Sequence, residues 1–506
     1  MNKKLFPYHS SRRTYLQTAA VLGLSPLSNI AFPKQLFSRN HLTASITLEP
    51  DVLDPTYSHA ASAGQVVHLN ILEGLTKIDE SGHPQPLLAQ SWQISADRKS
   101  YRFELRTNAR FHDGAPLTAD TVLFSFLRAQ QAGKKNKAHG AVFSNIAHMQ
   151  ASAAHTLLIQ LHRPDPYFLF RLGESTAVIL HPHTAKQTAQ HPIGTGPYRF
   201  IAWQRARSVH MRRFEDYHSP DSRTLEYAVF RFIPTLPEQT QAMERGEIDV
   251  AFNFIAHDLH RLQSDARYQV LIGSTSSKGL LAINHRVPVL QDLRVRQALT
   301  HAIDKQAFID RVMEGKSTAI GSHFTPTDPG FLNLANTHSY NPTQAKRLLR
   351  EAGITQPLAL TLTVLPVPYA RAGAPVIAEY LAQVGIQLEI QPVTWAEWQA
   401  HTFKGAFELS LITHVEPFDH LIYQDPDYYF GYDSPAFRAL VARHSASNNP
   451  RERQQLFADL QRHLATDAAS VWLFSPQLCT VARKGLQGLR MNHPILAHDL
   501  SAMHWA

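Results

Sequence analysis

The stretch at residues 46–128 decides the fold of this chain: ITLEPDVLDPTYSHAASAGQVVHLNILEGLTKIDESGHPQPLLAQSWQISADRKSYRFELRTNARFHDGAPLTADTVLFSFLR. Apolar and polar residues alternate at 101–106, which predicts a half-buried strand. A turn is predicted at 111–114, and the Thr-Ala-Asp run at 118–120 opens a helix. Strand and helix signals keep alternating along the chain, and this pattern predicts an α/β protein.

Length and composition allow more than one hydrophobic core. The chain has 506 residues, 44% of them apolar, and single cores stop growing near about 250–300 residues. Residues 1–44 hold six Lys and Arg and no acid, so removing them lowers the formal net charge from +8 to +2. The remainder lacks the basic surface expected of a nucleic-acid-binding protein. The one cysteine, Cys479, excludes an internal disulfide, a CxxC metal site and an N-terminal lipid anchor.

Residues 1–44 are predicted to be an export signal and leader. Arg12 and Arg13 resemble the arginine pair of a twin-arginine signal, and a modestly apolar run follows at 18–32. That run is too short and weak to span a bilayer. A general-secretion signal with a chance arginine pair is the alternative, and the cleavage site stays open. No later apolar run reaches about 18 residues, so the exported protein is expected to be soluble and periplasmic.

The order of short motifs in the chain resembles the large extracytoplasmic solute-binding proteins of peptide-type ABC transporters, called family 5. The matching motifs at 46–128 are EPDVLDP at 49–55, EGL at 73–75, PLLAQSW at 86–92, YRFELR at 101–106 and FHDGAPLTADTVLFS at 111–125. Later matches are GTGPY at 194–198, GEIDVA at 246–251 and DLRVRQAL at 292–299. One such motif alone would be weak evidence for this family, but the whole set in this order is specific to it.

This resemblance implies the two-lobe periplasmic binding protein fold of type II, in its large class with an extra subdomain. The ligand cleft lies between lobes that are joined by two chain crossings, and such proteins work by hinge closure around the ligand. The expected division is lobe I at 45–270 and 476–506, an extra subdomain within it at about 75–185, lobe II at 271–475, and crossings near 273–278 and 474–478.

Five candidate ligand contacts lie outside residues 413–420, the segment that departs from the family pattern. The resemblance implies that Tyr57 and His59 contact ligand, with an exposed lobe edge as the alternative. Tyr369 and Arg371 are expected in a loop just before a helix, where the guanidinium of Arg371 can bind a carboxylate as a fork. Trp395 follows a predicted strand in the family's aromatic position, and core packing is its alternative.

The segment THVEPFDH at 413–420 departs from the family pattern. Peptide-binding members often carry an aromatic residue and then an Asp that pairs with the peptide ammonium. Here His414 stands near the aromatic position and Glu416 near the Asp, with Phe418 and Asp419 as further candidates. The alternative is that Glu416 and Asp419 are both acids at the rim of the cleft. The departure leaves simple dipeptide specificity in doubt.

The resulting hypothesis is a monomeric substrate-binding component of an ABC importer. It captures di- or oligopeptides in the periplasm and delivers them to the permease subunits, with no cofactor, metal or nucleic acid. Because the chain contains 29 His, a nickel chelate or another non-peptide solute is an alternative ligand. His414 and His420 would then be the residues to test. A sensor or chaperone is the alternative of another class. An enzyme is disfavoured because GxSxG, HExxH, P-loop and GxGxxG motifs are absent from the sequence.

Overall fold

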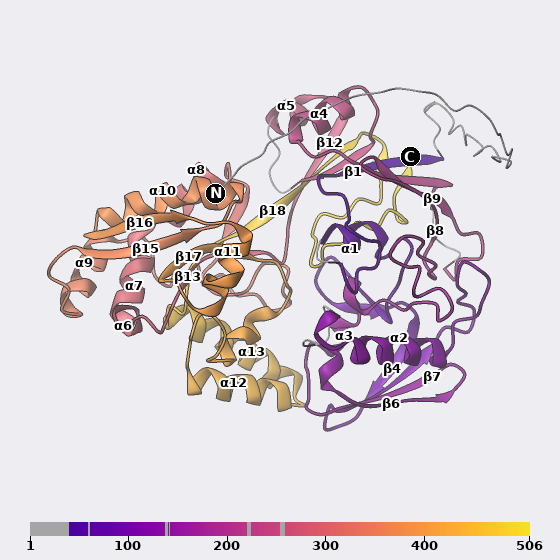
Figure 1. Ribbon diagram of the computed structural model, residues 1–506, viewed down its shortest axis with the longest axis horizontal. Helices are drawn as coiled ribbons and strands as arrows, with labels where there is room; N and C mark the ends of the chain where they lie inside the picture. The colour runs from indigo at the N-terminus through magenta and orange to yellow at the C-terminus, as the bar shows by residue number, and fades with distance from the viewer. Residues whose placement is uncertain (1–39, 59–60, 137–139, 141, 220–223, 254–258) are drawn as a thin grey trace, which may run out of the picture. The chain divides into compact units, whose positions relative to one another are not determined.

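A mixed sheet of twelve strands organises the computed structural model, which describes residues 40–58, 61–136, 140, 142–219, 224–253 and 259–506 (Figure 1). The strands are β1 (His41–Ile46), β8 (Tyr198–Gln204), β9 (Ser208–Arg213), β10 (Tyr227–Phe232), β11 (Val250–Asn253), β12 (Tyr268–Ser274), β13 (Lys278–Ile283), β14 (Ser317–Ala319), β15 (Leu358–Val364), β16 (Ile386–Pro392), β17 (Leu409–His414) and β18 (Val471–Arg483). Their order is β16-β15-β17-β13-β18-β11-β1-β10-β9-β8, and β12 and β14 also pair with β18.

The long strand β18 connects the two halves of this sheet. Its first residues pair antiparallel with β13 and β14, and its last residues pair antiparallel with β11 and β12. In Figure 1 it runs from the orange elements that follow β13 to the indigo and magenta elements around β1. One continuous strand therefore serves both halves.

A second connection, between β12 and β13, lies beside β18. The hydroxyl of Thr275 donates to the Pro476 carbonyl at 2.6 Å, and that of Ser475 donates to the Thr275 carbonyl at 3.3 Å. Gly273 is required here, because an added Cβ would lie 1.6 Å from the Met491 carbonyl oxygen. These contacts tie the two connections together. The division into lobes at the predicted boundaries stays a prediction.

Helices surround the half of the sheet that contains β13. They are α6 (Pro288–Gln291), α7 (Leu293–Ala302), α8 (Lys305–Val312), α9 (Pro342–Glu351), α10 (Pro368–Ala382), α11 (Trp395–Ala400), α12 (Pro435–Ala446) and α13 (Pro450–Thr466). The marked helix predicted from the sequence is confirmed as α9. Its cap Asn341 accepts a hydrogen bond from the Gln344 amide, and Gly353 follows with φ +84°. All six residues of β13 are buried against these helices.

Helix α10 corrects the loop predicted around Tyr369 and Arg371. The helix begins at Pro368, where a proline without an N–H is tolerated, so both residues lie in its first turn. It then continues through Pro375, which cannot donate to the carbonyl of Arg371. The loop was predicted because this segment is rich in Pro and Gly, but the helix accommodates both prolines.

The other half of the chain adds smaller sheets to the main one. Its elements are α1 (Ala61–Val67), α2 (Ala119–Ala132), α3 (Phe168–Arg171), α4 (Leu236–Glu244) and α5 (Leu259–Ser264), the sheet of β4 (Ala89–Ile94), β5 (Ser100–Leu105), β7 (Thr156–Leu161) and β6 (Ile146–Ala153), and the pairs β2 (Thr76–Ile78) with β3 (Pro84–Pro86) and β19 (Leu486–Gln487) with β20 (His504–Trp505). The predicted strand at 101–106 is confirmed as β5, and the predicted helix start is confirmed by the Thr118 cap of α2.

The turn before α2 carries a buried histidine with a structural role. His112 Nε2 bonds to the Gly196 carbonyl at 2.9 Å, and its Nδ1 accepts from the Gly194 amide at 3.3 Å. Burial lowers the pKa of His112 to about 4. The side chain therefore ties the turn to the GTGPY segment. Among the described residues, no helix is long and apolar enough to cross a membrane.

Candidate functional site

A buried charged network forms where β13 and β17 meet. Lys278 and His414 are register partners on these antiparallel strands. Lys278 is only 1% exposed, and its Nζ donates to Asp419 Oδ1 at 2.6 Å and to the Glu416 carbonyl at 2.5 Å. The same ammonium thus holds both the carboxylate and the backbone of the segment that departs from the family pattern.

Asp419 receives two further donors. His323 Nε2 donates to Oδ1 at 2.7 Å, and His414 Nδ1 donates to Oδ2 at 2.9 Å. Burial alone would raise the pKa of Asp419, but the surrounding positive charge and donors hold it well below its usual range. Burial lowers the pKa of His323 to about 4, so His323 is a neutral donor at pH 7. Lys278 therefore supplies the charge that balances Asp419.

The same cluster has the composition of a metal site. One ligand atom each from His323, His414 and Asp419 lies within 4.8 Å of the others. However, the Lys278 ammonium already contacts Asp419 Oδ1 at 2.6 Å, and a metal ion would have to displace it. As arranged, the cluster is a hydrogen-bonded ion pair whose cation comes from the chain itself.

Aromatic contacts join the two halves of the chain just beyond this network. Tyr167, which precedes α3, stacks on Phe418 with centroids 4.3 Å apart and planes at 14°, and Phe170 meets Phe418 edge-on at 4.8 Å. The Tyr167 hydroxyl and His420 Nε2 share a hydrogen bond of 3.1 Å. Phe418 has φ +52°, an uncommon conformation for a bulky residue. The surrounding contacts hold its ring between Tyr167 and the network.

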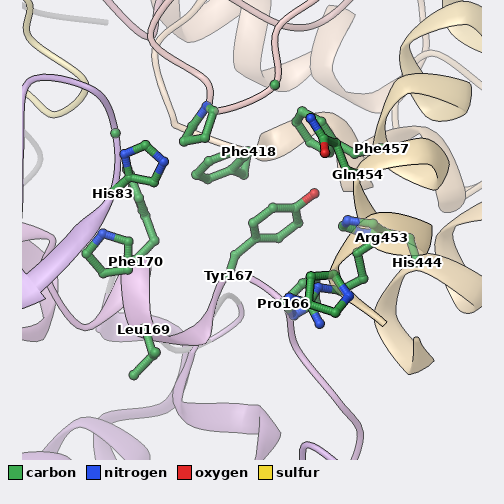
Figure 2. A pocket seen from close by; sticks show the side chains of 15 residues that line it. His83, Pro166, Tyr167, Leu169, Phe170, Phe418, His444, Arg453, Gln454 and Phe457 are labelled. Carbon is green, nitrogen blue, oxygen red and sulfur yellow. The ribbon is translucent and has the colours of Figure 1, made fainter. Parts of the chain in front are cut away.

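A pocket of about 510 Å³ opens beside the Tyr167–Phe418 stack (Figure 2). This volume lies within the range of small-molecule sites. In Figure 2 Tyr167 stands in the centre, with His83 and Phe170 to one side and Arg453 and His444 to the other. The residues that line the pocket are Gly82, His83, Pro84, Pro166, Tyr167, Leu169, Phe170, Pro329, Gly330, Phe418, His444, Pro450, Arg453, Gln454 and Phe457.

Two carboxylates near these contacts have no basic partner in the described part of the chain. Glu416 is exposed and accepts a hydrogen bond from the Val415 amide at 3.2 Å. Burial raises the pKa of Glu174 to about 7, a shift that Arg171 opposes and Glu416 increases. Arg171 itself pairs with Asp165 at 2.7 Å. Among the described residues, neither carboxyl group therefore forms an ion pair with a basic side chain.

Of the predicted ligand contacts, only Phe418 lines the described pocket. His414, Glu416 and Asp419 lie on the same segment as Phe418 but are not among the residues that line it. Tyr369 is half-buried, and its hydroxyl accepts from the Thr413 amide at 2.8 Å.

The remaining predicted contacts lie elsewhere or outside the description. Tyr57 lies under the Arg128 guanidinium, 4.6 Å from its ring centre. Arg371 is exposed on α10, and Trp395 is 49% exposed at the start of α11, so neither lines the described pocket. His59, Arg12 and Arg13 lie outside the described residues.

Sequence reasoning missed Lys278, His323, Tyr167 and Arg453. Lys278 carried a usable signal, because a lysine that begins the apolar run KGLLAI is expected to be buried and to need a partner. Nothing local identified that partner, since Asp419 is 141 residues away. Tyr167 lies within residues 129–188, where the sequence resembles the family least.

Comparison with known proteins identifies the family of this chain and its fold. Di/tripeptide-binding protein 1 of Pseudomonas aeruginosa is 27% identical over 432 residues, which cover 79% of this chain and 80% of the relative. Substrate-binding protein CtaP of Listeria monocytogenes superimposes with a TM-score of 0.81 at 21% identity, covering 92% and 99% of the two chains. Periplasmic binding protein DppA of Helicobacter pylori, solved with the peptide STSA, superimposes with a TM-score of 0.77 at 23% identity. The match covers 92% of this chain and 98% of that chain.

The structural likenesses confirm the predicted two-lobe α/β fold. The model for the middle region of the bacterial extracellular solute-binding proteins, family 5, matches residues 83–434, which is more than half of the chain. The chain therefore belongs to family 5 of the bacterial extracellular solute-binding proteins.

Proposed function

We propose that this protein is the substrate-binding component of an ABC importer and captures di- or oligopeptides for delivery to a membrane permease. The observation that carries the proposal is the pocket between Tyr167 and Phe457, which is lined by residues from both halves of the chain. Aromatic and proline walls accept varied side chains, while charged groups nearby can meet the ends of a peptide. Several relatives, including the one from Pseudomonas aeruginosa, are described as di- or tripeptide-binding proteins.

The working cycle follows from hinge closure. The connections at 273–278 and 474–478 act as the hinge, and ligand shifts the lobes toward the closed form. Glu416 meets the ammonium of the peptide, because its carboxylate is exposed and has no basic partner among the described residues. Asp419 has a structural role, because Lys278 already neutralises it. No step of this cycle requires covalent chemistry or a cofactor.

The location and partners belong to the same proposal. The protein works as a monomer outside the cytoplasm and is exported through the signal at Arg12 and Arg13. Its membership of an extracellular solute-binding family supports this location. Lobe I comprises 45–270 and 476–506 with the extra subdomain, and lobe II comprises 271–475.

Mass spectrometry of the protein purified from the periplasm tests the proposal. We expect denaturation to release a heterogeneous set of small peptides from the wild type, and far fewer from Glu416→Gln. The control is Glu389→Gln, which neutralises an exposed acid on β16 and should retain the wild-type load.

Other released masses would contradict the peptide assignment. A single non-peptide mass, or nickel with an organic chelator, would replace it and direct mutagenesis to His414 and His323. Equal retention by Glu416→Gln and the wild type would remove Glu416 from the site.

A further inference from the structure

The pocket contains a cation that no acid among the described residues neutralises. Arg453 projects into it from α13, and its Nη1 hydrogen-bonds the Ser447 carbonyl at 3.4 Å. Within the described ranges, Arg453 forms no ion pair with a carboxylate. A half-buried guanidinium without an anion is unusual, because burying a charge requires compensation.

A second arginine reinforces this positive charge from the other half of the chain. Arg98 lies in the turn between β4 and β5 with φ +56°, a conformation that favours glycine or asparagine. Its Nε is buried without a hydrogen-bond partner, and its side chain pairs with no described acid. Burial lowers the pKa of Arg453, and the nearby charge of Arg98 lowers it further. Arg98 therefore adds positive charge near Arg453, and neither arginine pairs with an acid among the described residues.

The neighbours of these arginines do not supply the missing anion. Burial, Arg453 and Arg98 together lower the pKa of His444 to about 4, so this pocket-lining ring is neutral at pH 7. Burial raises the pKa of Tyr101 to about 12, with Arg98 and Arg453 opposing the shift and Asp165 adding to it, so its hydroxyl also stays neutral. The carboxylate of Asp165 already pairs with Arg171 at 2.7 Å. The aromatic faces of Tyr167 and Phe457 complete the wall beside Arg453.

We propose that Arg453, supported by Arg98, is the anion-binding end of this pocket and receives the carboxylate of an organic ligand whose apolar body lies against Tyr167 and Phe457. Guanidinium forks bind carboxylates through paired, charge-assisted hydrogen bonds. The inference deepens the proposed function. It rests on that function only where it identifies the carboxylate as the C-terminus of a peptide.

Isothermal titration calorimetry with three probes tests the inference: the dipeptide Ala-Phe, its C-terminal amide, and 3-phenylpropionate. We expect the wild type to bind Ala-Phe at least tenfold more tightly than the amide, since only the acid offers a carboxylate. Arg453→Gln should weaken Ala-Phe and 3-phenylpropionate at least tenfold while changing amide binding less than twofold. Arg98→Gln should produce the same pattern with a smaller loss.

The matched control is Arg451→Gln, an exposed arginine two residues earlier on α13, which should bind all three probes as the wild type does. Thermal unfolding checks folding, and we expect Arg453→Gln to keep the wild-type Tm because it removes like-charge repulsion. Equal affinity for acid and amide, or an equal loss in Arg451→Gln, would overturn the inference.

The probes separate this inference from the proposed function. If Ala-Phe does not bind but 3-phenylpropionate binds in an Arg453-dependent way, the peptide function fails and the anion site stands. If neither carboxylate binds, the anion site is overturned. Phenyl phosphate serves as a fourth probe, and its binding more tightly than 3-phenylpropionate would overturn the carboxylate assignment.

Discussion

The charged groups around Phe418 fall into two regions with opposite properties. The Asp419 carboxylate is bonded by Lys278, His323 and His414, so every charge in that cluster is balanced within the chain. Arg453, which lines the pocket beside Phe418, has no carboxylate partner in the described residues. A balanced buried charge belongs to the fold, whereas an unbalanced charge at a pocket is available to a ligand. We therefore assign the Asp419 cluster a structural role, and the Arg453 pocket is the proposed ligand site.

The strongest test of this contrast is Asp419→Asn. The change leaves the Lys278 ammonium buried without a counter-ion, and we expect the free energy of unfolding to fall by about 3–5 kcal/mol. Urea denaturation measures it. The control, Asp427→Asn, removes an exposed acid and should change the free energy by less than about 0.5 kcal/mol. Similar values for the two variants would show that Asp419 is not part of a structural ion pair.

Acid should weaken the same cluster through His323. The pKa of His323 is about 4 in the fold and 6.5 when unfolded. Its stabilising contribution is therefore complete above pH 6.5 and is lost as the pH falls toward 4. Between pH 6.5 and 5 this loss is up to about 2 kcal/mol. Urea unfolding at several pH values should show a shallower decline for His323→Gln than for the wild type, and parallel declines would contradict the assignment.

A smaller effect is expected where the two halves of the chain meet. Tyr167→Phe removes the hydrogen bond between the hydroxyl and His420 but keeps the stack on Phe418. We expect a loss of about 1 kcal/mol in the free energy of unfolding. Tyr340→Phe, at a partly exposed tyrosine far from Phe418 in sequence, should lose less than half as much. An unchanged stability in Tyr167→Phe would mean that this contact does not hold the halves together.

The smallest effects are expected at two residues that the sequence placed in the cleft. Arg371 and Trp395 are exposed and do not line the described pocket. Arg371→Gln and Trp395→Ala should change the affinity for Ala-Phe by less than twofold in calorimetry. A tenfold loss in either variant would restore the original prediction and place a second part of the ligand site near α10 or α11.

Local features of this chain were predictable and long-range pairings were not. Helix α9 could be predicted because Asn341 and Gly353 act within a few residues of the helix that they bound. The loop predicted at Tyr369 and Arg371 was wrong, because Pro368 and Pro375 are local signals against a helix that α10 nevertheless contains. The partner of Lys278 could not be inferred, because 141 residues separate it from Asp419 and only the folded sheet brings them together.

The direct test of the account is hydrogen–deuterium exchange of the protein with and without the ligand pool released from the wild type. We expect ligand to slow exchange in three segments that border the pocket, at 165–175, 415–424 and 450–458, and to leave α9 unchanged. Protection confined to other segments, or no protection at all, would contradict the conclusion that solute is held between the two halves of the chain beside Tyr167 and Arg453.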